Sequence, residues 1–127
     1  MFEERLAQAK DLNFVKANVT NIVDGDTVDV CIDGINERVR LIGVDSPERN
    51  EVGFEDAANF TRNQIEKVDN VVWLQSSGGE RDRFGRLRRY VWLGIPRLPI
   101  NSIDRSSLLL NQILKDNGYG IVLRINR

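Results

Sequence analysis

The side chains that this 127-residue chain offers for chemistry exclude several common mechanisms. The chain has no histidine and a single cysteine, Cys31. Without an imidazole, hydrolysis by a nucleophile–histidine pair and by histidine-bound metals is excluded. One cysteine forms neither an internal disulfide nor a cysteine-based zinc site. Any catalysis must therefore use carboxylates, guanidinium groups and, where a metal takes part, a hard cation that prefers oxygen ligands.

The first candidate cluster is the turn Asp24-Gly25-Asp26-Thr27. Asp26 shares strand parity with Val28 and Val30, so its side chain is expected on the core side at the end of a strand. A carboxylate there needs a metal, an arginine or water to compensate for its burial. In the competing interpretation, the two aspartates only bond local backbone amides, and for this tetrapeptide alone that interpretation is favoured.

The second cluster runs from Val39 to Glu48. Arg40 interrupts an otherwise apolar strand, which indicates that both faces of the strand are largely buried and that an anion must match the buried guanidinium. Asp45 and Glu48 follow at the strand's exit, on either side of Pro47. A functional site and a structural ion pair between Arg40 and one of these acids are equally compatible with this pattern.

The third cluster is the loop Arg81-Asp82-Arg83-Phe84-Gly85-Arg86. Alternating arginines around a glycine are able to wrap a phosphate with paired hydrogen bonds. An isolated run of this kind is more often a solvated basic turn. Each cluster is weak evidence by itself, and the three together are stronger.

Apolar periodicity predicts the elements that position these clusters. Strands are expected at 14–23, 26–32, 37–44, 70–75 and 87–93, with a hairpin turn at Asp33-Gly34. Helices are expected at 53–68 and from 106 or 107 to a terminating Gly118. Residues 94–105, with Pro96 and Pro99, are expected to form a connecting loop.

The order of three strands, helix, two strands and helix fits an α+β fold built on a five-stranded OB-fold barrel, with an interposed helix and a second, C-terminal helix. Another α+β packing also fits this order. Residues 13–127 are expected to form one domain. Residues 1–12 are expected to be an N-terminal extension, for which Phe2, Leu6 and Ala9 predict a short helix.

The charge pattern is uneven although the formal net charge is only −1. Five arginines fall between residues 81 and 89, whereas the acids are concentrated elsewhere in the chain. Arginine suits paired recognition of phosphate. No apolar run is long enough to span a membrane, and the first residues do not resemble a secretory signal.

The three clusters together resemble the successive motifs of the staphylococcal nuclease family. The matching segments are Asp24 to Val28, Arg40 to Glu48 and Asp82 to Arg86, in the family's order and at compatible spacing. The resemblance covers about residues 14–122. It implies an OB-fold barrel with the site on its surface, and it favours a secreted or cell-surface setting. Separately, the protein is expected to be a monomer.

The resemblance also implies roles for particular residues. Asp26, Asp45 and the Ser46 carbonyl would bind Ca²⁺. Glu48 would position or deprotonate the attacking water, and Arg40 and Arg86 would grip the scissile phosphate. Arg83 and Phe84 would contact the substrate.

Several positions depart from the family pattern. Ser46 and Phe84 stand where the family has threonine and tyrosine, and Arg124 and Asn126 fall where tyrosines line its base pocket. Tyr119 and Trp92 are candidate substitutes for base stacking, with core packing the alternative for Trp92.

The resemblance implies a Ca²⁺-dependent nuclease that cleaves DNA and RNA, prefers single strands and leaves 3′-phosphate ends. One alternative is a weak or inactive OB-fold module that binds nucleic acid or protein. Another is a metal-stabilised structural domain. Retention of Asp26, Arg40, Asp45, Glu48 and Arg86 favours the nuclease.

Overall fold

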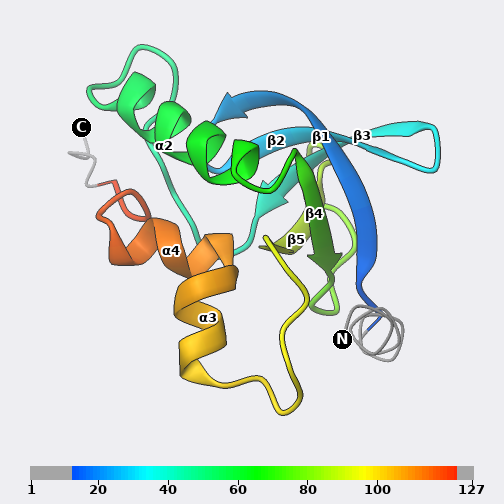
Figure 1. The fold of residues 1–127 in the computed structure, drawn as a ribbon. Helices are drawn as coiled ribbons and strands as arrows, with labels where there is room; N and C mark the ends of the chain where they lie inside the picture. Colours follow the sequence, from blue (N-terminus) through cyan, green and yellow to red (C-terminus); the bar gives the residue numbers. More distant parts are fainter. Residues whose placement is uncertain (1–12, 123–127) are drawn as a thin grey trace.

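The computed structural model describes residues 13–122. Within this range five strands and three helices follow one another along the chain (Figure 1). The strands are β1 (Val15–Asp24), β2 (Thr27–Ile32), β3 (Ile35–Leu41), β4 (Val71–Gln75) and β5 (Leu87–Trp92). The helices are α2 (Phe54–Glu66), α3 (Ser102–Leu108) and α4 (Leu110–Asp116). The helix expected within residues 1–12, and positions 124 and 126, lie outside the described residues.

The five strands close into a barrel in the order β1-β2-β3-β5-β4. Neighbouring strands are antiparallel except β3 and β5, which are parallel. Parallel neighbours require a long crossover, and here α2 and β4 lie in the connection between β3 and β5. The predicted α+β fold, a five-stranded barrel with an interposed helix, is therefore confirmed.

Alternating side chains of the strands fill the barrel, as period-two patterning requires. Val28 and Val30 of β2 are fully buried, as are Val39 and Leu41 of β3. The predicted two-residue hairpin turn is present, because Asp33 and Gly34 both have positive φ angles, 49° and 82°. β3 ends at Leu41, earlier than expected, because Gly43 adopts a left-handed φ of 72° that a strand cannot continue.

Helix α2 lies across the β1 side of the barrel (Figure 1). It buries Ala57, Ala58, Thr61 and Ile65 on one face, as its apolar spacing predicted. The small alanines let the helix approach the turn between β1 and β2 closely. A Cβ atom added to Gly25 would lie only 2.9 Å from the Ala57 Cβ atom, so glycine is required there.

The expectation of one continuous C-terminal helix after a loop at 94–105 is wrong. The chain forms two short helices, and α3 begins earlier, at Ser102. Asn101 starts α3 because its side chain accepts a 2.8 Å hydrogen bond from the Asp104 amide. Leu109 is extended between the helices and is buried beside Phe14 and Trp92. Burial of Leu109 in this second apolar cluster therefore interrupts the helix.

None of the helices within residues 13–122 is long and apolar enough to cross a membrane.

Candidate active site

The first two candidate clusters meet at one end of the barrel. Thr27 of β2 pairs with Arg40 of β3, so the turn that carries Asp26 lies opposite the end of β3. The segment that follows β3 returns past the same turn, because the Ser46 amide donates a 2.9 Å hydrogen bond to the Asp26 Oδ2 atom. Strand register and this loop therefore bring together residues that are separated by 20 positions.

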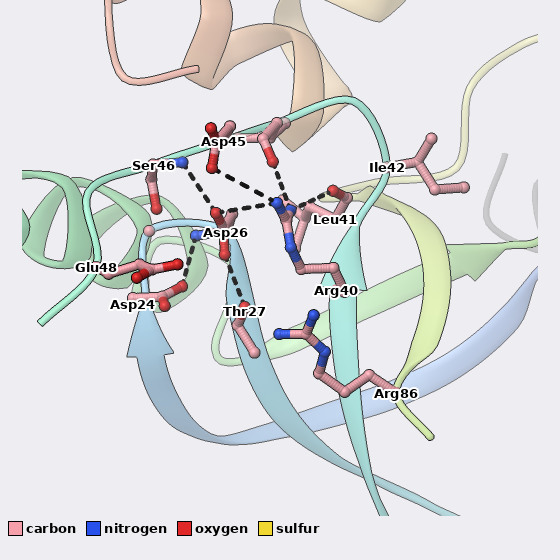
Figure 2. A network of polar contacts seen from close by, with 12 residues as sticks. Asp24, Asp26, Thr27, Arg40, Leu41, Ile42, Asp45, Ser46, Glu48 and Arg86 are labelled. Atoms are coloured by element: carbon pink, nitrogen blue, oxygen red, sulfur yellow. Dashed lines mark hydrogen bonds and ion pairs between the residues drawn. The ribbon is translucent and has the colours of Figure 1, made fainter. Parts of the chain in front are cut away.

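Asp26 is the centre of this network (Figure 2). The residue is buried as expected, with 5% of its surface exposed. Its Oδ1 atom accepts a 2.7 Å hydrogen bond from the Thr27 hydroxyl. The local turn contact is made instead by Asp24, whose Oδ1 atom accepts a 3.1 Å hydrogen bond from the Asp26 amide. The local-turn interpretation thus holds for Asp24, while the Asp26 carboxylate also reaches across to Ser46.

Arg40 supplies the positive charge in the same network. Its Nη2 atom lies 3.4 Å from Asp26 Oδ2 and 3.9 Å from Asp45 Oδ1. Its Nη1 atom donates to the backbone carbonyls of Leu41 and Val44. The anion expected near this half-buried guanidinium is therefore present. Asp45, which follows β3, forms an ion pair with Arg40.

The two aspartates of the turn have opposite pKa shifts. Burial raises the pKa of Asp24 to about 7, and the neighbouring Asp26 charge adds to the effect. Burial acts in the same direction on Asp26, but hydrogen bonds from its neighbours and the Arg40 charge outweigh it and lower the pKa of Asp26. Asp26 is therefore the more readily ionised member of the pair.

The donor chemistry of this network fits a hard cation. Asp26 and Asp45 approach the same guanidinium nitrogen of Arg40, so their carboxylates converge on a position that favours positive charge. Among residues 13–122, no three His, Cys, Asp or Glu side chains are gathered into a ready metal site. A bound ion would thus need backbone carbonyl and water oxygens besides these carboxylates. In Figure 2 the Glu48 carboxylate points toward the Asp24–Asp26 turn.

The third cluster lies in the loop before β5. The Arg86 Nε atom is 2.6 Å from Asp82 Oδ2, and the Asp82 carboxylate also accepts hydrogen bonds from the Phe84 and Arg86 amides. Asp82 therefore orients Arg86 and leaves its terminal amino groups available. The Arg86 guanidinium points toward Arg40 in Figure 2. Arg83 and Phe84 are exposed on the same loop.

Two supporting residues escaped the sequence reasoning. Thr61 is buried on the inner face of α2, and its hydroxyl donates a 2.7 Å hydrogen bond to the Gly25 carbonyl and so fixes the Asp26 turn. Asn111 is buried in α4, where its side chain accepts from the Val91 amide and donates to the Ile42 carbonyl, each at 2.9 Å. A polar residue amid the leucines of α4 was the available signal.

The candidate base-stacking residues differ in their accessibility. Trp92 is 2% exposed, stacks on Phe14 and donates to the Gln75 side chain, so it belongs to the core. Tyr119 is half-buried against Phe60, with ring centroids 4.7 Å apart. Core packing is therefore the correct interpretation for Trp92.

Comparison with known proteins finds thermonucleases among the proteins that this chain resembles. The chain is 39% identical to a thermonuclease of Staphylococcus intermedius over 82 residues, which cover 60% of this chain and 48% of that protein. A thermonuclease of Staphylococcus hyicus is 37% identical over 82 residues, covering 60% of this chain and 47% of that protein. These similarities and the closed barrel support a staphylococcal nuclease-like domain.

A further relative extends over most of the chain. An uncharacterized protein of Bacillus anthracis is 30% identical over 123 residues, which cover 91% of this chain and 51% of that protein. The chain thus spans about half the length of the curated relatives that it matches. No protein-family profile matches the chain.

Proposed function

We propose that this domain is a Ca²⁺-dependent nuclease that hydrolyses phosphodiester bonds of DNA and RNA, with a preference for single strands. Its products would carry 3′-phosphate ends, and it would act as a monomer. The observation that carries the proposal is that the Asp26 and Asp45 carboxylates lie together around the Nη2 atom of Arg40, at 3.4 and 3.9 Å. Similarity to the two thermonucleases supports the same class of reaction.

In this proposal the acids hold the metal and orient water. Asp26 and Asp45, with the Ser46 carbonyl, would hold Ca²⁺. When bound, the ion would supply Lewis-acid catalysis and a template for the phosphate. A site with so few protein ligands should bind calcium weakly, with a Kd on the order of 10⁻⁴–10⁻³ M. Glu48 would position the attacking water or accept its proton.

The arginines would act on the phosphate. Arg40 and Arg86 would donate hydrogen bonds to its oxygens and stabilise the charge that develops during attack. Asp82 already fixes the Arg86 Nε atom, so the terminal amino groups need little reorganisation to receive an anion. Arg83 and Phe84 would contact the neighbouring substrate. None of these roles requires the histidine that the sequence lacks.

One observation favours a second candidate, a binding module with little or no catalysis. Several arginines in and near the 81–89 segment are already paired with acids. These pairs are Arg38 with Asp29, Arg81 with Glu37 and Arg86 with Asp82. Such pairing weakens the attraction that a nuclease needs for its polyanionic substrate. This candidate predicts weak binding of nucleic acid, or binding of a protein, without calcium-dependent cleavage.

Digestion of denatured DNA and of RNA by the purified chain, with Ca²⁺ or with EGTA, separates the two candidates. The nuclease proposal predicts cleavage with Ca²⁺ only, and products that accept a 5′ label but need phosphatase treatment before 3′ extension. Binding without cleavage over a broad range of calcium concentration and alkaline pH would support the binding module and contradict the nuclease.

A further inference from the structure

A second set of basic side chains lies beside the proposed reaction centre. Val39 of β3 pairs in parallel with Leu87 of β5, so Arg38 and Arg86, one residue earlier on each chain segment, face the same side one strand spacing apart. Together with Phe84 and Gly85 they line a surface pocket of about 530 Å³. Arg38 stands outside the three clusters to which the sequence assigned chemistry.

Phe84 gives this pocket an apolar wall that faces solvent. The residue is 68% exposed, which is unusual for a large aromatic side chain. The guanidinium carbons of Arg83 and Arg86 lie 4.8 and 5.3 Å from its ring centroid. Aromatic rings and arginine planes are the surfaces on which unpaired bases stack.

Arg38 gives the pocket a fixed cation. Its Nε and Nη2 atoms bind the two carboxylate oxygens of Asp29 at 2.7 and 3.2 Å. A guanidinium has five N–H donors, so this pair holds the group in place and leaves its Nη1 donors for another acceptor. Its side chain remains 51% exposed. Aromatic surface and oriented donors therefore lie together in one pocket.

We infer that this pocket, which we call the Arg38–Phe84 pocket, binds the nucleotide next to the scissile phosphate of a single strand. Its base stacks on Phe84 and the adjoining guanidinium groups, and its phosphate accepts hydrogen bonds from Arg38. The inference rests on the proposed nuclease function, because the strand is held at Arg40 and Arg86. It assigns Arg38 to substrate selection, in favour of unpaired strands whose bases are free to stack.

Equilibrium binding of a fluorescent oligothymidylate, measured by anisotropy in EGTA over a series of salt concentrations, tests this assignment. The slope of log K against log salt counts phosphate contacts, at about 0.7 per contact for single strands. The variant Asp29→Asn/Arg38→Gln removes a neutral pair, so the net charge of the protein is unchanged. We expect its slope to be smaller than that of the wild type by about 0.7. An unchanged slope and affinity would overturn the role of Arg38.

The Phe84→Leu variant tests the stacking surface. We expect about tenfold weaker binding with no loss of salt slope, since the base loses its aromatic stacking surface while no charge is removed. The control is Arg105→Gln, which removes an exposed arginine of α3 and should leave the slope unchanged. Wild-type affinity in Phe84→Leu, equal slope losses in Arg105→Gln and Asp29→Asn/Arg38→Gln, or no saturable binding by the wild type would contradict the inference.

These results are separable from failure of the nuclease proposal. Calcium-dependent cleavage by the wild type, together with unchanged binding in both pocket variants, would overturn the pocket alone. Absence of cleavage by the wild type under all calcium conditions would overturn the nuclease proposal, whatever the pocket variants bind.

Discussion

The contacts of Arg40 and Arg86 fix the orientation of their guanidinium groups. Arg40 is fixed by two backbone carbonyls through one terminal nitrogen and faces Asp26 and Asp45 through the other. Arg86 is fixed through its Nε atom by Asp82. Both guanidinium groups are therefore oriented before any ligand arrives, which is the condition for effective stabilisation of developing charge.

Replacing either arginine by lysine should impair cleavage severely. Arg40→Lys and Arg86→Lys keep the charge but lose the planar pair of donors, and we expect kcat to fall by about 10²–10³. Arg105→Lys, on α3, is the matched control and should cleave at the wild-type rate. Wild-type turnover in Arg40→Lys or Arg86→Lys would remove that arginine from the proposed mechanism.

Glu48→Gln should separate turnover from binding. The amide retains the shape of the side chain but cannot accept a proton, so we expect kcat to fall by about 10²–10⁴ while oligonucleotide affinity changes little. Steady-state kinetics and anisotropy on the same oligonucleotide measure the two quantities. Equal losses in turnover and affinity would indicate a structural role for Glu48.

The Asp82–Arg86 pair should make stability depend on acid pH. Although burial acts to raise the pKa of Asp82, hydrogen bonds and the Arg86 charge lower it below its ordinary value of 3.8. The ionised carboxylate therefore stabilises the folded chain above that value, and this contribution is lost as the pH falls through the lowered pKa. We expect Asp82→Asn to have a lower Tm than the wild type at pH 7. The difference should shrink below pH ~3.8, and a constant difference across this range would contradict the pairing.

At the scale of elements, the site depends on how closely α2 approaches the turn between β1 and β2. Thr61 of the helix binds the Gly25 carbonyl, and Gly25 lies against Ala57 and Ser46 without room for a side chain. The turn that carries Asp26 is thus packed against α2 and hydrogen-bonded to it. A shift of α2 would move Asp26 relative to Arg40.

Gly25→Ala should therefore reduce both stability and activity. The added Cβ atom would lie 2.9 Å from Cβ atoms of Ala57 and Ser46, and overpacking of this kind costs about 1–3 kcal/mol. Gly34→Ala is the contrasting variant, because Gly34 has a positive φ but no neighbouring atom within 4 Å. Urea unfolding should show both variants destabilised, while only Gly25→Ala loses cleavage. Equal activity in the two variants would contradict this coupling.

Sequence patterns located the strands well because period-two alternation follows directly from the pleat. They also placed Asp26 on the core side, from its parity with Val28 and Val30. The division between α3 and α4 was not predictable from local pattern, because it depends on burial of Leu109 against Phe14. These two residues are 95 positions apart in the sequence. The hydrogen bonds of Asn111 were likewise not predictable, because they depend on tertiary contacts with Val91 of β5 and with Ile42.

At the scale of the whole molecule, closure of the barrel joins the three sequence clusters. The parallel pairing of β3 with β5 brings the Arg86 loop beside the Arg40 strand. Asn111 of α4 then ties β5 to the segment after β3, and the Gly120 carbonyl accepts a 2.8 Å hydrogen bond from the Asp45 amide. The fold therefore brings separate segments of the chain close together, which no single cluster does alone.

The most direct test is the rate of cleavage of one fluorescent single-stranded oligonucleotide across a calcium titration, for the wild type and Asp26→Ala. Circular dichroism should first establish that the variant is folded. We predict that the wild-type rate rises with calcium and saturates at concentrations on the order of 10⁻⁴–10⁻³ M, whereas Asp26→Ala shows no calcium-dependent cleavage. Equal calcium-dependent cleavage by the folded variant and the wild type would contradict the assignment of this network as the active site.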